Sequence, residues 1–105
     1  MCGRYTLTAS NKPDLAHLNL DIPDRYNIAP QADVLVETDQ AEFALMSWSF
    51  SPAWAKTPMN LFNARAETLT EKPSFKDAQR CVFIADGWYE WQRAVSPSRP
   101  WYHHS

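Results

Sequence analysis

The scarcity of glycine constrains this chain more than any other feature of its sequence. Two glycines, Gly3 and Gly87, stand against eight prolines among 105 residues. Glycine adopts left-handed backbone at little steric cost, so most tight turns here must be made with Pro, Asn or Asp instead. The length allows one domain at most, residues 1–105, and a hydrophobic content of 45% is enough for a core.

The pattern of apolar residues predicts a strand-rich α+β fold. Short apolar or alternating runs predict strands at residues 3–7, 34–36, 43–48, 81–85 and 88–91, with another strand starting at Trp101. We expect a mixed or antiparallel sheet, a hairpin through residues 38–40 and a turn at Asp86-Gly87. Because residues 81–85 are all apolar, we expect this strand to be buried on both faces.

Short helices should flank these strands. Ser10 or Asn11 is a suitable N-cap, Pro13 suits a first helical turn, and leucines follow on one face (Leu15, Leu18 and Leu20). Residues 74–79 should form one or two helical turns. Periodicity leaves residues 62–69 open between a strand and a short helix.

The first residues carry a reactive pair of groups once Met1 has been removed. Cys2 then presents a free α-amine and a thiol on one residue. The amine can attack an aldehyde to give an imine, and the thiol can add to the same carbon to close a thiazolidine ring. Both nucleophiles are already tethered, so ring closure loses little entropy. The alternative is that Cys2 is an unreactive, buried sulfur.

Charge and cysteine content narrow the class of protein. A net charge of −2 argues against a broadly basic nucleic-acid-binding protein, although an arginine-lined local groove remains compatible with it. The sequence has no export signal and no membrane span, so we expect a cytoplasmic protein with two reduced thiols. No Cys/His cluster has metal-ligand spacing; we therefore expect no metal and no cofactor, and treat His103-His104 as a loose tail.

Three further stretches place polar residues where chemistry is plausible, and the first of them is Asn27 to Pro30. In an extended segment, Asn63, Arg65 and Glu67 would share one face, with Glu67 holding Arg65 for a phosphate; the alternative is a solvated Arg–Glu pair. Glu90 follows the apolar strand and lies between Tyr89 and Trp91. A partly desolvated carboxylate there could move protons near neutral pH, unless it faces water.

Six ordered motifs together closely resemble the SRAP (SOS response-associated peptidase) family of abasic-site-processing proteins. They occupy residues 1–5, 25–30, 48–56, 63–68, 72–75 and 85–91. The resemblance implies an SRAP-like, barrel-like β core with short flanking helices. It also implies a partner, single-stranded DNA containing abasic sites, and a monomer for the full-length protein.

The resemblance further implies roles for individual residues. Cys2 would form the thiazolidine with the abasic-site aldehyde, Asn63 would contact the opened sugar, and Glu90 would act as acid and base. The implied DNA-binding residues are two phosphate-binding arginines and three residues that stack on bases or surround a kink (Arg4, Arg65, Pro30, Trp48 and Trp54). Self-removal of Met1 underlies the peptidase name.

Two departures from the family pattern affect this interpretation. Ser49 follows Trp48 where relatives usually carry glycine, which would hinder a close approach of DNA to the backbone. The family domain also continues beyond residue 105, and its catalytic His lies in that further part. We therefore interpret the chain as the N-terminal part of a single, truncated SRAP domain. The rival interpretation is a non-catalytic DNA-binding remnant of the same family; a thiol peptidase using Cys2 lacks a recognisable Cys–His context.

Overall fold

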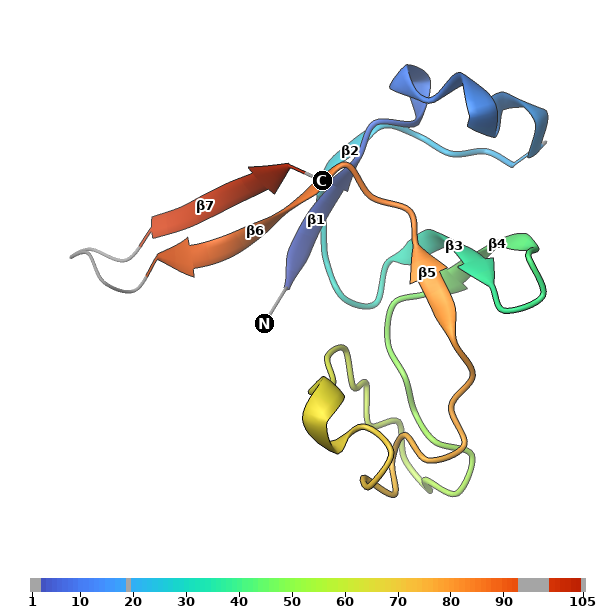
Figure 1. Cartoon of the computed structure of the whole chain (residues 1–105), viewed down its shortest axis with the longest axis vertical. Helices are drawn as coiled ribbons and strands as arrows, with labels where there is room; N and C mark the ends of the chain where they lie inside the picture. The colour runs from blue at the N-terminus through green and yellow to red at the C-terminus, as the bar shows by residue number, and fades with distance from the viewer. Residues whose placement is uncertain (1–2, 19, 93–98, 105) are drawn as a thin grey trace.

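The computed structural model describes residues 3–18, 20–92 and 99–104, and its strands form two antiparallel sheets (Figure 1). The first sheet has the order β2-β1-β6-β7 and the second has the order β4-β3-β5. The strands are β1 (Arg4–Leu7), β2 (Arg25–Ile28), β3 (Asp33–Thr38), β4 (Phe43–Ser47), β5 (Cys81–Phe83), β6 (Gly87–Gln92) and β7 (Arg99–His104). The predicted strand-rich fold is confirmed, and the pairing is antiparallel.

The core lies where the two sheets face each other. Its buried hydrophobic residues are Tyr5, Leu7 and Ile28 from the first sheet, Val34, Leu35 and Val36 from β3, and Trp48 just after β4. Tyr5 and Trp48 meet edge to face with ring centroids 5.3 Å apart, and Phe83 packs 5.7 Å from Trp48. Such aromatic pairs stabilise a core beyond the area they bury.

One short segment between β5 and β6 joins the sheets. The backbone N–H of Ile84 donates to the carbonyl oxygen of Leu35 in β3 at 3.1 Å. Two residues later, the N–H of Asp86 donates to the carbonyl oxygen of Thr6 in β1 at 2.8 Å. The chain thus leaves one sheet and enters the other within three residues.

The helices lie near the predicted positions but are 3₁₀-helices: η1 (Ala9–Asn11), η2 (Pro13–Leu18) and η3 (Ala66–Thr68). Bonds of the i→i+3 type, from Lys12 N to Ala9 O and from Leu15 N to Lys12 O (both 3.0 Å), set this tighter winding. Leu15, Leu18 and Leu20 pack against the core, as their spacing predicts. Residues 62–69 resolve into extended chain followed by η3.

Residues other than glycine occupy the left-handed positions of the described chain. These are Gln31 (φ 75°), Ala41 (φ 59°) and Asn60 (φ 49°). Gln31 follows Pro30 in a turn closed by a 3.2 Å bond from Ala32 N to Ala29 O, as in a type II turn. Ala41 sits in the β3–β4 hairpin, between Asp39-Gln40 and Glu42. We expected Pro, Asn or Asp to replace glycine in tight turns, and of these three residues only Asn60 is one of those types.

Four local predictions were wrong. His103 and His104, expected to form a loose tail, belong to β7, and the His103 ring stacks on Trp88 with ring centroids 5.2 Å apart. The strand at residues 81–85 is shorter, and all three residues of β5 are exposed because the strand pairs with β3 on one side alone. Residues 74–79 form turns and irregular chain in place of a helix. Gly87 is the first residue of β6, where its missing Cβ lets β7 approach closely, and does not serve a turn.

Candidate functional site

The N-terminal end of β1 lies beside Glu90. Antiparallel pairing puts Arg4 opposite Tyr89, Tyr5 opposite Trp88 and Thr6 opposite Gly87. Glu90, the next residue of β6, is half-buried and pairs on its other side with Trp101 of β7. The chain therefore enters the sheet next to this carboxylate. Met1 and Cys2 lie outside the described residues.

Arg4 is held in place by the neighbouring strand. Its Nη1 donates a hydrogen bond of 3.1 Å to Oδ1 of Asn27 in β2. From the other flank, the Tyr89 hydroxyl donates to the carbonyl oxygen of Tyr26 at 3.0 Å, which ties β6 to β2 across β1. The Arg4 guanidinium stays exposed. Sequence reasoning gave Asn27 and Tyr89 no role, although both lie within the quoted motifs.

A second group of predicted site residues lies on the long loop between β4 and β5. Phe50 and Leu61 form an isolated bridge with backbone bonds of 2.7 and 2.9 Å, which closes residues 51–60 into a loop of their own. The Ser51 hydroxyl accepts from Met59 N at 2.9 Å inside that loop. The half-buried Asn63 lies two residues beyond Leu61.

Trp48 fixes this loop to the core. Its indole Nε1 donates to the carbonyl oxygen of Phe62 at 3.1 Å, one residue before Asn63. The side chain is only 6% exposed, so its ring offers no face to a nucleobase. This corrects the expectation that Trp48 stacks on DNA: its place in the structure is that of an anchor.

Trp54, in contrast, is 60% exposed and available for stacking. Pro30 is half-buried in the turn between β2 and β3. Two backbone hydrogen bonds of 2.8 Å hold this turn to the N–H and to the carbonyl oxygen of Trp48. The backbone of Ser49 is not left-handed. A side chain at this position, where relatives usually carry glycine, therefore causes no backbone strain. The Ser49 N–H donates to Ser47 O at 2.9 Å.

Arg65 is exposed at the start of η3 and retains extended backbone (φ −83°, ψ 130°). Glu67 already belongs to the helical turn. The alternation expected to place Asn63, Arg65 and Glu67 on one face therefore stops at Arg65. The backbone at the start of η3 therefore sets the position of Arg65.

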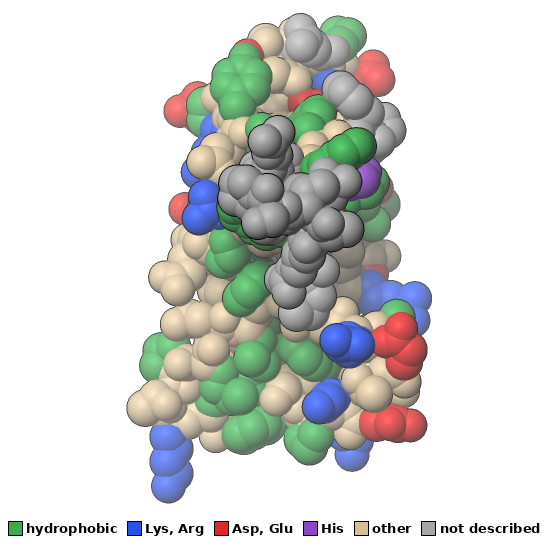
Figure 2. Space-filling model, turned by 90° about the vertical axis from the view of Figure 1, so that its left-hand side faces the viewer, with side chains coloured by type: hydrophobic (Ala, Val, Ile, Leu, Met, Phe, Trp, Pro, Cys, Tyr) green, Lys and Arg blue, Asp and Glu red, His purple; other side chains and the backbone are tan. Residues whose placement is uncertain are grey.

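Hydrophobic and basic side chains gather on the same face as this loop. Figure 2 shows hydrophobic side chains over the lower part of the molecule, where Figure 1 places the β4–β5 loop, with Lys and Arg side chains at the margin and some Asp and Glu among them. Large exposed hydrophobic residues of the loop are Trp54, Met59, Phe62 and Leu69. Exposed aromatic groups beside cations are the combination that single-stranded nucleic acids require.

Asp86 forms an ion pair and two hydrogen bonds at the sheet junction. Thr8 donates both its backbone N–H and its hydroxyl to Oδ2 of Asp86, and Lys12 Nζ lies 2.9 Å from Oδ1. Burial raises the pKa of the Asp86 carboxyl, but the hydrogen bonds from Thr8 and Lys12 and the Lys12 charge together lower it. Hydrogen bonds from the hydroxyl and N–H of Ser10 likewise lower the pKa of the exposed Asp24.

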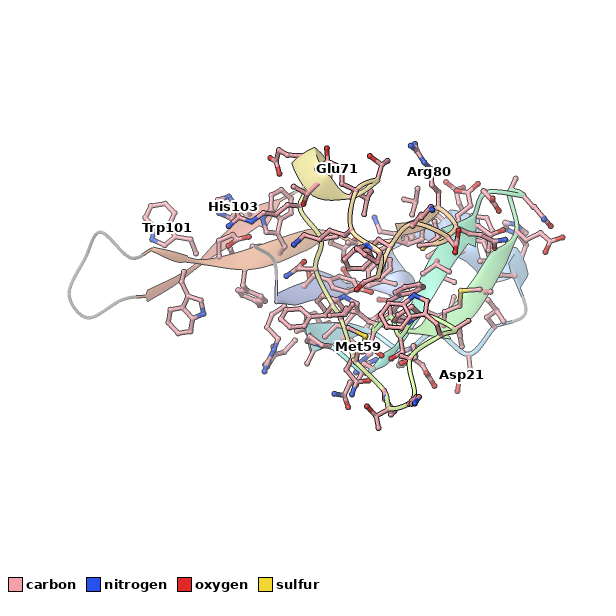
Figure 3. The ribbon with its side chains drawn as sticks, turned by 90° about the horizontal axis from the view of Figure 1, so that it is seen from below. Asp21, Met59, Glu71, Arg80, Trp101 and His103 are labelled. Atoms are coloured by element: carbon pink, nitrogen blue, oxygen red, sulfur yellow. The ribbon has the colours of Figure 1, made fainter. Side chains whose placement is uncertain are left out.

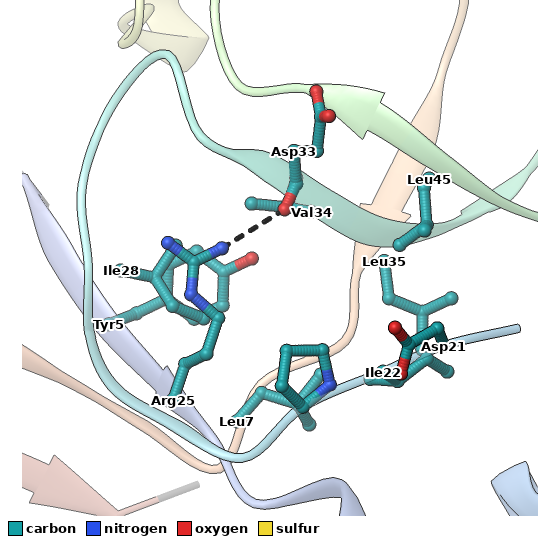
Figure 4. Close-up of a pocket in the computed structure, with 11 residues that line it drawn as sticks. Tyr5, Leu7, Asp21, Ile22, Arg25, Ile28, Asp33, Val34, Leu35 and Leu45 are labelled. Atoms are coloured by element: carbon teal, nitrogen blue, oxygen red, sulfur yellow. Dashed lines mark hydrogen bonds between the residues drawn. The ribbon is translucent and has the colours of Figure 1, made fainter.

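A hollow of about 280 Å³ lies between the two sheets, away from the predicted site (Figure 4). Arg25 spans its rim, where Nη1 donates to Asp33 O at 3.2 Å. None of the predicted site residues that the structure describes lines it. Over residues 3–18, 20–92 and 99–104 there is no group of three His, Cys, Asp or Glu side chains suited to a metal ion. No helix within these ranges is long and apolar enough to span a membrane.

Comparison with known proteins connects this arrangement to one family. Residues 1–105 match the family model described as "SOS response associated peptidase (SRAP)". The abasic site processing protein YoqW of Bacillus subtilis is 36% identical over 109 residues, covering 89% of this chain and 49% of the relative. YedK of Escherichia coli, of the same description, is 32% identical over 118 residues, covering 97% of this chain and 53% of the relative.

A solved structure shows the same fold. A phage-related protein from Bordetella bronchiseptica superposes with a TM-score of 0.72 at 29% identity, over 98% of this chain and 55% of that chain. The chain thus spans about half the length of the curated bacterial relatives it matches.

Proposed function

Because this chain belongs to the SOS response-associated peptidase (SRAP) family, we propose that it processes abasic sites in DNA by capturing their aldehyde at Cys2. The observation that carries this proposal is the register of β1 against β6. Arg4 pairs with Tyr89, so the chain's N-terminal end enters the sheet beside Glu90. Cys2 is two residues from Arg4, and two residues of extended chain span about 7 Å at most.

The bond-forming steps of the proposed reaction use the two nucleophiles that Cys2 supplies. The Cys2 amine attacks the aldehyde carbon of the ring-opened sugar, and the resulting carbinolamine loses water to give an imine. The Cys2 thiolate then adds to the imine carbon, and the nitrogen takes up a proton as the thiazolidine closes. Glu90 would transfer protons during the loss of water. The amide of Asn63 would donate to a hydroxyl oxygen of the opened sugar.

The proposed DNA partner is single-stranded, since an unpaired strand exposes both its bases and its phosphates. Arg4 and Arg65 would bind phosphates through their exposed guanidinium groups. Trp54 would stack on a base and Pro30 would border the strand, while the exposed loop hydrophobics exclude water. Removal of Met1, which frees the Cys2 amine, is the proposed peptidase step.

Covalent capture is tested with an oligonucleotide that carries one abasic site. Intact mass first establishes that Met1 is absent. The wild type should give a heat-stable shifted band on a denaturing gel, and Cys81→Ser should match it because Cys81 is the other, exposed thiol. Cys2→Ala should give a band only after borohydride reduction, which traps the imine. Glu90→Gln should slow adduct formation about 100-fold or more.

A heat-stable, unreduced band from Cys2→Ala equal to that of the wild type would refute the thiazolidine assignment. Binding to undamaged strands is measured separately. Arg65→Ala should reduce the salt slope of affinity by about 0.7. Trp54→Ala should weaken binding by about 1–3 kcal/mol. Strand binding without any adduct would favour the rival function, a non-catalytic DNA-binding protein.

A further inference from the structure

Asn27 is an exposed polar side chain in a position that strand formation alone does not explain. It belongs to β2, and asparagine is depleted in β-strands. Its side-chain oxygen Oδ1 accepts a hydrogen bond of 3.1 Å from Nη1 of Arg4, which lies 23 residues earlier in the chain. The contact therefore gives Asn27 a role that its own strand does not require.

The pairing of three strands holds this acceptor in place. Tyr89 of β6 lies opposite Arg4 of β1, and its hydroxyl donates at 3.0 Å to the carbonyl oxygen of Tyr26, the residue before Asn27. Tyr89 belongs to the β6–β7 hairpin, which projects away from the rest of the molecule (Figure 3). Its bond to Tyr26 ties this hairpin to β2 across β1, and Ile28, the residue after Asn27, pairs with β1. The backbone of Asn27 is therefore held on both sides while its side chain contacts Arg4.

An arginine that binds a phosphate gains from such an acceptor. The guanidinium carries five N–H donors in one rigid plane, so a hydrogen bond at one nitrogen sets the direction of the others. Immobilising a long side chain on binding lowers affinity, and orienting it beforehand removes part of that loss. An amide orients the Arg4 cation without neutralising it, whereas a carboxylate at position 27 would compete with the phosphate for the same charge.

We propose that Asn27 is a positioning residue for DNA binding: it orients the exposed Arg4 guanidinium toward a phosphate and does not itself contact the DNA. The inference rests on the proposed phosphate contact of Arg4 and adds the residue that prepares this contact. Its consequence is that the whole contribution of Asn27 to DNA affinity passes through Arg4. Removing Asn27 from a chain that already lacks the Arg4 guanidinium should then change nothing further.

A double-mutant cycle on the 105-residue chain tests this coupling. Binding of a labelled, undamaged oligothymidylate is followed by fluorescence anisotropy between about 50 and 200 mM salt. Arg4→Ala should weaken binding about tenfold and reduce the salt slope of affinity by about 0.7, because one phosphate contact is lost. Asn27→Ala should weaken binding about three- to tenfold and leave the slope unchanged, because the Arg4 charge remains. In the Arg4→Ala background, Asn27→Ala should change the affinity by less than about twofold.

Asn27→Gln is the matched conservative variant. It keeps an amide oxygen near Arg4 and should regain most of the affinity that Asn27→Ala loses, with circular dichroism and Tm unchanged in both variants. An Asn27→Ala effect that persists in the Arg4→Ala background would overturn the proposal, because Asn27 would then act on the DNA or on the fold directly. Wild-type affinity of Asn27→Ala beside weakened binding of Arg4→Ala would overturn this inference alone. Wild-type affinity and slope of Arg4→Ala would overturn the proposed phosphate contact as well.

Discussion

Gly87→Ala tests how closely β7 must approach β6. A Cβ at position 87 would lie 2.2 Å from the carbonyl oxygen of His103 and 2.6 Å from Cζ and Oη of Tyr102. The Tyr102 ring could swing aside, but its hydroxyl would then lose the 2.7 Å hydrogen bond with Thr6 Oγ1. The His103 carbonyl belongs to the backbone, so the strands themselves must separate.

The magnitude follows from these two contacts. Overpacking of a close contact costs about 1–3 kcal/mol, and loss of one hydrogen bond costs about 0.5–1.5 kcal/mol. We therefore expect a loss of about 2–4 kcal/mol from the free energy of unfolding, which for a chain of this size lowers Tm by about 10–25 °C. Most single domains are stable by only about 5–15 kcal/mol, so the loss is a large fraction of the total.

Thermal and urea unfolding, followed by circular dichroism, measure the effect. Gly3→Ala is the matched control. A Cβ added at Gly3, the other glycine of the chain, would meet no atom within 4 Å, so the Tm of this variant should stay close to that of the wild type. Gly87→Ala with a Tm within about 3 °C of the wild type would refute the close-approach argument.

The remaining predictions concern backbone strain and pH. Ala41→Gly should raise the free energy of unfolding by about 0.5–1 kcal/mol, because Ala41 holds φ 59° in the β3–β4 hairpin; an unchanged urea midpoint would contradict this. Since the folded pKa of Asp86 is lowered, its contribution is present above the unfolded pKa of about 3.9 and is lost as pH falls through the folded pKa. Asp86→Asn should therefore destabilise the chain at neutral pH and flatten its acid unfolding, whereas Asp39→Asn in the exposed hairpin should leave the stability at neutral pH unchanged.

Strand positions were predictable because local patterns determine them. The β3–β4 hairpin and the strand at Trp88 follow from apolar runs separated by polar turn residues, and the structure confirms both. The leucine face of η2 was predictable for the same reason. The 3₁₀ winding was not, because it depends on which carbonyl each N–H reaches in a segment too short for regular α-helix.

What the sequence could not reveal depends on neighbours across the fold. The apolar composition of residues 81–85 indicated burial, but burial requires a covering element, and β5 has β3 on one side alone. The role of Gly87 depends on Tyr102 and His103, which are distant in sequence. In the sequence Asn27 is one polar residue among several, and only the pairing of β1 with β2 brings it within hydrogen-bonding distance of Arg4.

Trp48 shows why the site cannot be understood without the fold. The candidate site residues fall into two groups, one at the start of β1 beside Glu90 and one on the loop that carries Asn63. Trp48 contacts the neighbours of both: its ring packs 5.3 Å from Tyr5, the neighbour of Arg4, and its Nε1 donates to Phe62 O, next to Asn63. One buried indole therefore links the two groups. In the proposed chemistry Trp48 would act by alignment, since small displacements of reacting groups slow catalysis steeply.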